Sequence, residues 1–308
     1  MAETWAAARF LHFAAAMAAF GIAAFRHYAF AGAGRTIDAA VRAAFDAALA
    51  RAMAVAAGLA LASALAIIPF TAAEMAGSDA AARDPTIWHA VLFDTQFGRV
   101  WCWHCGFAAA LLLLCAGPQR PWLVEAASVV ALLLLASLGL TGHAAMDMGG
   151  GASHEINQTA HLVAGGLWLG GLLPLGMLLR RALRPGGAAY AALAQTALPH
   201  FSQIGYAAVA LLLITGTVNS LMLVGSLPAL FGTPYGRLLA VKIALVLAMV
   251  GLALVNRLRF VPRLGTPGSA IAALRALSWS VAAEQAIGIA ILAVVAVLGT
   301  WPPAAMRM

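Results

Sequence analysis

Residues 121–142 read PWLVEAASVVALLLLASLGLTG, with Glu125 as the one charged residue. An α-helix needs about 20 apolar residues to cross the hydrocarbon core of a bilayer, and this stretch is long enough. The same criterion, applied outward along the chain, gives eight predicted spans. They lie at 4–26, 48–73, 98–116, 121–142, 154–179, 200–224, 235–257 and 274–300. The sequence therefore predicts an all-α polytopic membrane protein with eight transmembrane helices.

The composition of the whole chain agrees with this fold class. Of its 308 residues, 63% are hydrophobic and 9% are charged, and the mean hydropathy is +0.92. A soluble domain usually has about 25% charged residues, so a soluble fold is excluded. The first residues, MAETWAAARFLHF, lack the basic start of a signal peptide, and we expect an uncleaved first span. We expect one transmembrane domain over residues 1–308, with residues 36–50 forming an interfacial segment ahead of the second span.

Arginine is distributed unevenly between the two sides of the predicted bundle. The chain has 18 basic residues, and all except Lys242 are arginine. Twelve arginines fall in the joints of one side and five on the other, so the positive-inside rule makes the first side cytoplasmic. Both termini are then periplasmic. Arginines gathered in the joints favour topology control over nucleic-acid binding, which needs a basic patch on a solvated domain. The twelve are Arg26, Arg35, Arg42, Arg51, Arg120, Arg180, Arg181, Arg184, Arg257, Arg259, Arg263 and Arg275.

The turn after the fourth span is rich in potential metal ligands. Residues 142–161 read GHAAMDMGGGASHEINQTAH, and the turn lies on the predicted periplasmic side. Thioether sulfur together with imidazole favours copper, especially Cu(I). The candidate ligands are His143, Met146, Met148, His154 and His161. His154 and His161 share a helix face but lie roughly 10 Å apart along the axis, at about 1.5 Å per residue. We therefore expect two copper stations in series, with His154 at the mouth and His161 below it.

Other predicted spans place ligand-type residues at a similar depth. His12 lies about two turns into the first span, and the third span contains the stretch CWHC, with Cys102, His104 and Cys105. The two cysteines are three residues apart, so they can face one partner. A thiolate would bind copper tightly. The sequence therefore predicts a metal-binding layer near the periplasmic surface, although the CWHC stretch is equally compatible with small buried side chains beside a tryptophan.

Three polar residues stand out within predicted spans, where burying a charge or an amide in lipid is costly. They are Asn219, Lys242 and Glu284. One interpretation is an ion pair or amide network that locks helices together. The other is a translocation path that accepts an ion or proton from the outer stations. The sequence leaves both open.

Several segments together resemble a known family. The CopD/PcoD-type copper-resistance membrane proteins are similar over essentially the whole chain, most strongly over 141–303. The segments that carry the resemblance are TGHAAMDM at 141–148, HLVAGGLWLGGLLPL at 161–175, FSQIGYAAVALLLITGTVNSLMLVG at 201–225 and TPYGRLLAVKIALVLAMVGLALVNR at 233–257. The resemblance implies eight helices in the bacterial inner membrane, copper uptake from the periplasm, and a small periplasmic copper-binding donor of the CopC type. His143 and His161 match the family's recurring histidines, whereas CWHC does not belong to its pattern.

Two other functions fit the same residues. His12, His104 and His161 lie at depths compatible with axial ligands of a haem, as in a b-type membrane cytochrome or oxidoreductase. A copper assembly factor that does not transport would use the outer ligands but not Lys242 or Glu284. Apart from the haem alternative, the sequence predicts no enzymatic activity. It leaves the oligomeric state open.

Overall fold

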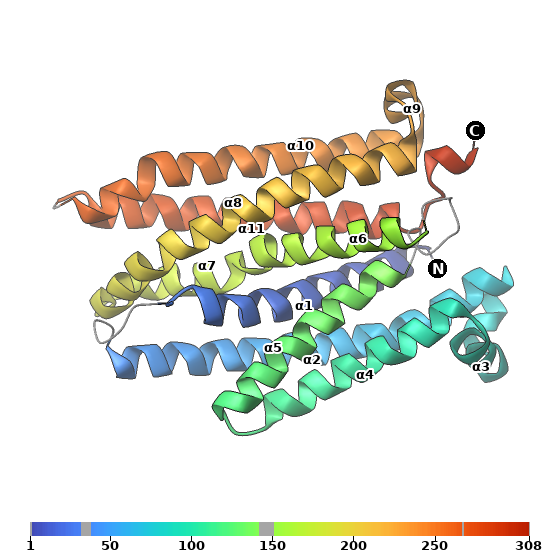
Figure 1. The fold of residues 1–308 in the computed structure, drawn as a ribbon, viewed down its shortest axis with the longest axis horizontal. Coiled ribbons are helices and arrows are strands. Elements are labelled where there is room, and N and C mark those ends of the chain that lie inside the picture. The colour runs from blue at the N-terminus through green and yellow to red at the C-terminus, as the bar shows by residue number, and fades with distance from the viewer. Residues whose placement is uncertain (1, 32–37, 142–150, 267, 308) are drawn as a thin grey trace.

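The computed structural model describes residues 2–31, 38–141, 151–266 and 268–307, and within them every regular element is a helix. Eight of these helical segments are long and apolar enough to cross a membrane, which confirms the predicted fold class. Figure 1 shows them lying side by side in an elongated bundle. The main helices are α1 (Ala2–Tyr28), α2 (Ala39–Ala76), α3 (Pro85–Asp94), α4 (Gln96–Ala116), α5 (Pro121–Ser137), α6 (Gly151–Gly165), α7 (Leu172–Ala182), α8 (Ala188–Val224), α9 (Leu227–Gly232), α10 (Pro234–Val255) and α11 (Ala270–Leu298). Short helical turns join them: η2 (Asp79–Arg83), η3 (Leu138–Leu140), η5 (Gly166–Gly170), η6 (Asn256–Phe260), η7 (Pro262–Gly265) and η8 (Ala304–Arg307).

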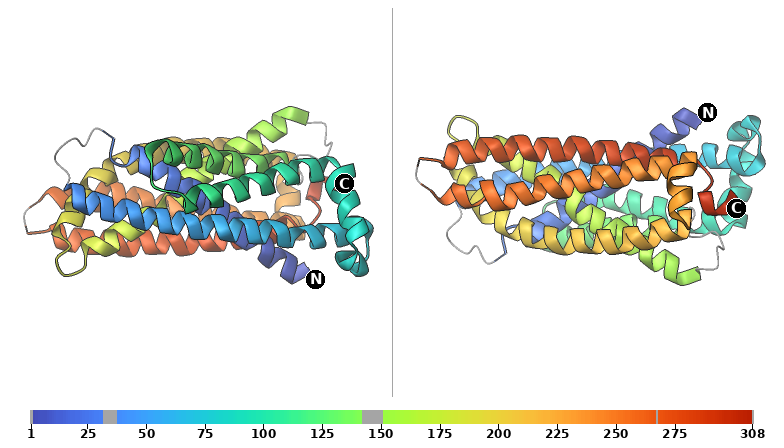
Figure 2. Two further views of the ribbon diagram at one scale, coloured as in Figure 1. Left: turned by 90° about the horizontal axis from the view of Figure 1, so that it is seen from below. Right: turned by 90° about the horizontal axis from the view of Figure 1, so that it is seen from above.

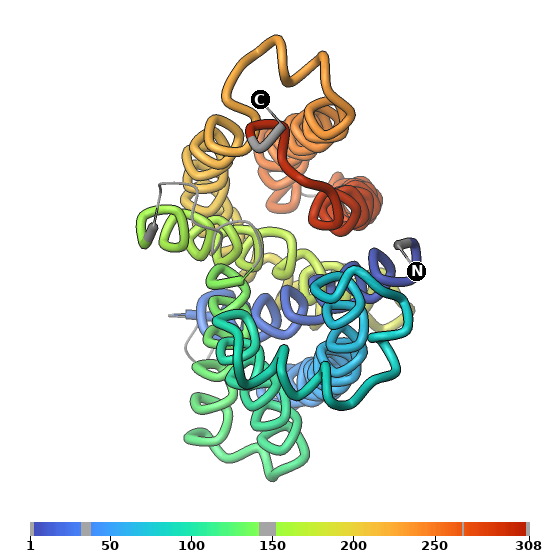
Figure 3. Tube along the Cα trace, turned by 90° about the vertical axis from the view of Figure 1, so that its right-hand side faces the viewer, coloured from blue at the N-terminus to red at the C-terminus, as the bar shows by residue number. Residues whose placement is uncertain are grey.

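The bundle consists of two groups of helices with α6, η5 and α7 between them. Seen along the bundle, α1, α2, α4 and α5 form one group, and α8, α10 and α11 form the other (Figure 3). Helix α1 lies centrally and packs against α2, α5, η5 and α11. The views in Figure 2 show α1 running obliquely through the bundle, with the start of α1 and the end of the described chain at the same end.

The helix boundaries differ from the sequence prediction in two places. Helix α2 is continuous from Ala39 to Ala76 and does not begin with a separate interfacial segment. Phe45 and Leu49 are fully buried in the protein core, so the interfacial interpretation of residues 36–50 is wrong over its described part. The short helix α3, Pro85–Asp94, was not predicted, since it lies in a polar joint and is too short to span. Both differences arise from packing against neighbouring helices, which apolar length alone does not report.

Polar caps at one end of the bundle fix where several spans begin. The side chain of Thr95 accepts a hydrogen bond from the backbone N–H of Gly98 at the start of α4. Thr233 does the same for Gly236 at the start of α10, where Pro234 takes the first helical position. Such caps satisfy N–H groups that have no partner within the helix. The depth of each side chain along α4 and α10 is therefore well defined.

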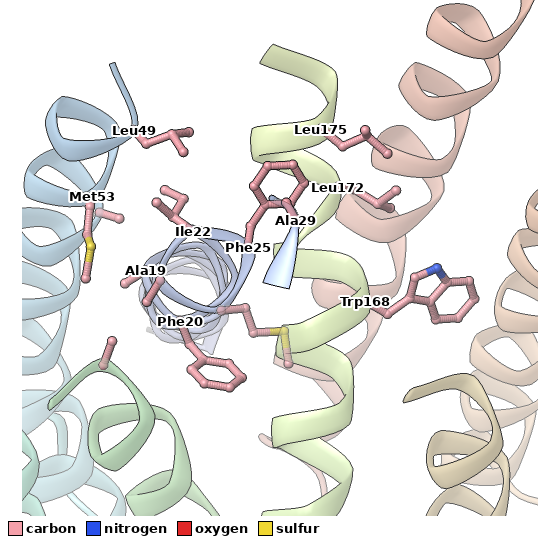
Figure 4. Close-up of a cluster of buried hydrophobic side chains, with 14 of the residues drawn as sticks. Ala19, Phe20, Ile22, Phe25, Ala29, Leu49, Met53, Trp168, Leu172 and Leu175 are labelled. Atoms are coloured by element: carbon pink, nitrogen blue, oxygen red, sulfur yellow. The ribbon is translucent and has the colours of Figure 1, made fainter. Parts of the chain in front are cut away.

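Glycine permits the closest contact in the centre of the bundle. A Cβ atom on Gly170 of η5 would lie 2.1 Å from the carbonyl oxygen of Met17, and one on Gly21 would lie 2.1 Å from the carbonyl carbon of Gly170. Small residues at helix contacts allow backbones in membranes to approach closely. Around this contact, large side chains such as Phe25 and Leu172 fill the interior (Figure 4). The glycines of the segment 161–175 therefore pack η5 onto α1.

Candidate metal site

Two histidines from different helices meet inside the first group. Nε2 of His12 on α1 lies 2.7 Å from Nε2 of His104 on α4. The side chains are 1% and 0% exposed, respectively. We call these two residues the histidine pair. Both were predicted as metal ligands from their depth in the first and third spans, and the structure brings them into direct contact.

Two serines hold the outer nitrogens of the histidine pair. Nδ1 of His12 lies 3.0 Å from Oγ of Ser63 and 3.2 Å from the carbonyl oxygen of Ala60, both on α2. Nδ1 of His104 lies 2.8 Å from Oγ of Ser137 on α5. A polar partner on the far ring nitrogen orients a histidine and is the usual arrangement around metal-binding histidines. Four helices thus contribute to this one site.

The proton positions on the histidine pair follow from its partners. The carbonyl oxygen of Ala60 only accepts, so Nδ1 of His12 carries a proton and Nε2 of the neutral ring carries a lone pair. Ser137 has one hydroxyl proton and two acceptors within reach, the Leu134 carbonyl oxygen at 2.9 Å and His104 Nδ1 at 2.8 Å. When Ser137 donates to His104, the Nε2–H of His104 donates to His12. When it donates to Leu134, both Nε2 lone pairs face each other and require a cation between them.

Trp101 supports the pair through its contact with His104. Its ring stacks on the His104 ring, with 4.8 Å between centroids and an interplanar angle of 17°. Its indole N–H donates to the carbonyl oxygen of Ala64, 3.1 Å away, and the side chain is 3% exposed. Because Trp101 is fixed by packing and by this hydrogen bond, it holds His104 in the orientation that directs Nε2 at His12.

His161 occupies a second polar position, on the far side of α6. Its Nδ1 lies 2.9 Å from Oγ1 of Thr215 on α8. The absence of a side chain at Gly216 leaves room for the ring, since a Cβ atom there would lie 3.3 Å from Cε1 of His161. This position is formed by α6 and α8, separately from the helices that hold the histidine pair.

Asn219 forms an amide cluster with α6. Its Oδ1 accepts a hydrogen bond of 2.8 Å from Nδ2 of Asn157, and its Nδ2 donates one of 2.8 Å to Oε1 of Gln158. The side chain is 9% exposed. Asn219 thus binds α8 to α6 above His161, within the same polar layer.

Glu284 lies deeper, between α10 and α11. The carboxylate accepts a hydrogen bond from Nδ2 of Asn256, and Oδ1 of that asparagine is buried without a hydrogen-bond partner. Glu284 is 2% exposed. Asn256 follows Lys242 by fourteen positions, which places the two roughly 21 Å apart along α10 at about 1.5 Å per residue. Glu284 therefore pairs with an amide and is remote from Lys242.

The remaining predicted ligands do not join the histidine pair. His154 is 3% exposed, and its Nδ1 is buried without a hydrogen-bond partner. Cys102 is exposed, with Sγ 3.9 Å from the Leu92 carbonyl oxygen, and Cys105 is partly buried at the edge of the core. The buried face of α4 carries His104 but neither of these cysteines. His143, Met146 and Met148 lie outside the described residues.

The number of metal ligands that lie close together is small. Among the described residues, no group of three or more His, Cys, Asp or Glu side chains is arranged to hold a metal ion. The histidine pair is a two-ligand arrangement.

Sequence reasoning missed four hydrogen-bond partners of the candidate site residues. They are Ser63, Ser137, Thr215 and Asn256. The one signal in the sequence is that these polar residues lie inside apolar helices. That signal is weak for serine and threonine, because their hydroxyls often hydrogen-bond to the backbone of their own helix.

Comparisons with known proteins identify the family. Residues 1–153 match the family described as "Copper resistance protein D-like, N-terminal domain", and residues 195–298 match "Copper resistance protein D". "Inner membrane protein YebZ" of Escherichia coli is 32% identical over 98% of this chain and 99% of its own length. "Copper resistance protein D" of Pseudomonas syringae is 34% identical over 55% of this chain and 56% of its own length.

A third relative matches three quarters of the chain. "Copper transport protein CutJ" of Bacillus subtilis is 29% identical over 75% of this chain and 42% of its own length. No solved structure matches the chain. The resemblance noted in the sequence is thus confirmed over nearly the full length. The chain, which has eight candidate spans, is a homologue of an inner membrane protein. The chain belongs to the copper resistance protein D family.

Proposed function

We propose that this protein takes Cu(I) from the periplasmic side of the inner membrane and carries it inward through the helical bundle. The names of two relatives, a copper resistance protein and a copper transport protein, support copper as the cargo. In this proposal both termini are periplasmic, because the arginine-rich joints lie at the opposite end. A small periplasmic copper-binding protein of the CopC type would supply the ion. The function is transport and not catalysis.

The observation that carries the proposal is the contact between His12 and His104 in the core. Each ring has its Nδ1 held by a polar partner and its Nε2 directed at the other ring. Cu(I) is well served by two imidazoles on opposite sides. With metal–nitrogen bonds of about 2 Å, the two nitrogens would stand about 4 Å apart. Loading the ion would therefore separate the rings by about 1.3 Å beyond their present 2.7 Å.

The same geometry favours an ion over haem. A porphyrin would have to enter between the two facing Nε2 atoms, which are now in hydrogen-bond contact. Trp101 is stacked on His104 and Ser63 holds His12, so neither ring is free to swing away. A single small ion requires only a short displacement of each ring. The serine partner of His104 also has a second acceptor available when both Nε2 atoms become ligands.

Other residues extend the path in this proposal. His143, Met146, Met148 and His154 would capture copper at the periplasmic mouth, where a methionine-rich turn suits Cu(I). His161, Asn219, Lys242 and Glu284 would then carry the ion further inward. A transport path needs sites that bind firmly enough to capture and weakly enough to release. Two-ligand stations satisfy that requirement better than a closed four-ligand cage.

The test is Cu(I) binding to the purified protein under anaerobic, reducing conditions. Replacing both His12 and His104 by glutamine keeps polar side chains in the core while removing the imidazole ligands. We expect the double variant to bind about one Cu(I) fewer per chain than the parent. His89→Ala is the control, because this exposed histidine lies on α3, outside the site. Equal copper binding by the parent and the correctly folded double variant would refute the assignment.

A further inference from the structure

The four helices that hold the histidine pair also enclose a small cavity nearer their other end. Its lining includes Arg26 of α1, Met53 of α2, Cys115 of α4 and Ala127 of α5. Gln119, from the turn between α4 and α5, also lines it. We call this the inner cavity. It brings together a thioether and a thiol, the two soft sulfur ligands available to a protein.

The inner cavity lies further along the same helices than the histidine pair. Cys115 follows His104 by eleven positions on α4, which is roughly 16 Å at about 1.5 Å per residue. Met53 precedes Ser63 by ten positions on α2, roughly 15 Å in the same direction, because α2 runs antiparallel to α4. Two independent helices therefore give the same offset. The cavity adjoins the joint that contains Arg120, which belongs to the arginine-rich end of the bundle.

The two sulfur atoms of the inner cavity belong to residues that were not among the predicted metal ligands. Met53 is 3% exposed and lies on α2 beside Ala19 and Ile22 of α1 (Figure 4). Cys115 is partly buried and packs against the core. Cys102, by contrast, is exposed on the outer face of α4. Cys115 and Met53 line the same cavity.

We propose that Met53 and Cys115 form an inner Cu(I) station, which receives the ion from the histidine pair and releases it toward the arginine-rich end. The inference rests on the proposed function, since it presumes that Cu(I) is the cargo. When Cu(I) binds, the thiol of Cys115 gives up its proton to water at the cavity mouth, and a copper–sulfur bond forms without a change of oxidation state. Arg26, whose guanidinium donates to Oε1 of Gln119, supplies a positive charge beside the thiolate.

The station can be tested through the reactivity of one cysteine. Because the chain has three cysteines, the Cys102→Ser, Cys105→Ser variant leaves Cys115 as the single thiol. The rate of alkylation by N-ethylmaleimide is measured at buffered concentrations of Ag(I), a redox-inert substitute for Cu(I). We expect Ag(I) to slow alkylation at least tenfold. Adding Met53→Leu should raise the Ag(I) concentration needed for half protection about tenfold, with each rate expressed relative to that of the same variant without silver.

Matched variants separate this station from simpler explanations. Met177→Leu removes a thioether on α7, outside the cavity lining, and should leave silver protection unchanged. In the otherwise unmodified protein, Cys115→Ser should lower Cu(I) binding by about one ion per chain. Equal protection with and without Met53, or unchanged Cu(I) binding by Cys115→Ser, would overturn the inner station. Such a result would leave the histidine pair intact, because its own test uses His12 and His104.

Discussion

Nε2 of His12 and Nε2 of His104 face each other at 2.7 Å inside the bundle. They belong to α1 and α4, two helices that are distant in the sequence. Each ring is anchored on its other side, one by α2 and one by α5. At this distance a proton fits between the two nitrogens, and a copper ion would fit once they stand about 4 Å apart. The hydroxyl of Ser137 has an acceptor available in either state, so it can serve the empty pair and the loaded pair alike.

Removing the Ser137 hydroxyl should weaken copper binding without removing a ligand. In Ser137→Ala, Nδ1 of His104 loses its partner, and such losses around metal-binding histidines reduce affinity by about tenfold or more. The affinity is measured by competition with a coloured Cu(I) chelator. Ser128→Ala is the matched control, since that serine lies on the same helix but contacts His27. An unchanged affinity in Ser137→Ala would show that the serine does not orient His104.

Replacing Glu284 by glutamine should separate transport from delivery. The amide keeps the size of the side chain and a polar contact with Asn256, but it removes a buried acid from the inward path. We expect copper accumulation by cells to fall at least fivefold, while Cu(I) binding by the purified variant stays at the parental level. Glu125→Gln, in an exposed position, is the control. Unchanged uptake would favour the assembly-factor alternative.

The eight spans were predictable because the bilayer imposes one length on every helix that crosses it. Depth was equally predictable, since residues can be counted from each end, and counting placed His12 and His104 in one layer. What counting does not give is rotation about the helix axis. It could not show that His104 points inward while Cys102 points outward, nor that Ser63 and Ser137 turn toward the histidines. Those orientations depend on packing between helices that are distant in sequence.

The partner of Glu284 shows where counting could have gone further. Helices α10 and α11 are adjacent and antiparallel, so residues at similar distances from their common turn lie at similar depth. Asn256 and Glu284 are each fourteen positions from Ala270, and they meet in the structure. Lys242 is twice as far from that turn. Residue type alone suggested an ion pair with Glu284, whereas position along the hairpin identifies the asparagine.

The visible spectrum of the purified protein should distinguish copper from haem. The contact between His12 and His104 leaves no gap for a porphyrin, so we expect no Soret band in protein from haem-replete cells. The same preparation loaded with Cu(I) should remain colourless, because Cu(I) has a filled d shell. A Soret band that disappears in His104→Ala would instead identify haem as the ligand of the pair.

Enlarging Gly170 should destabilise the bundle at its most crowded contact. A Cβ atom at this position would lie 2.1 Å from the carbonyl oxygen of Met17, and backbone cannot move aside as a flexible side chain can. Overpacking of this kind costs about 1–3 kcal/mol, so Gly170→Ala should lower the midpoint of thermal unfolding in detergent. Gly205→Ala on α8 is the control, since nothing lies within 4 Å of its added Cβ. There the change should be neutral or stabilising by up to about 1 kcal/mol, because alanine is the better helix former. Equal midpoints for the two variants would show that α1 and η5 are not held together by this contact.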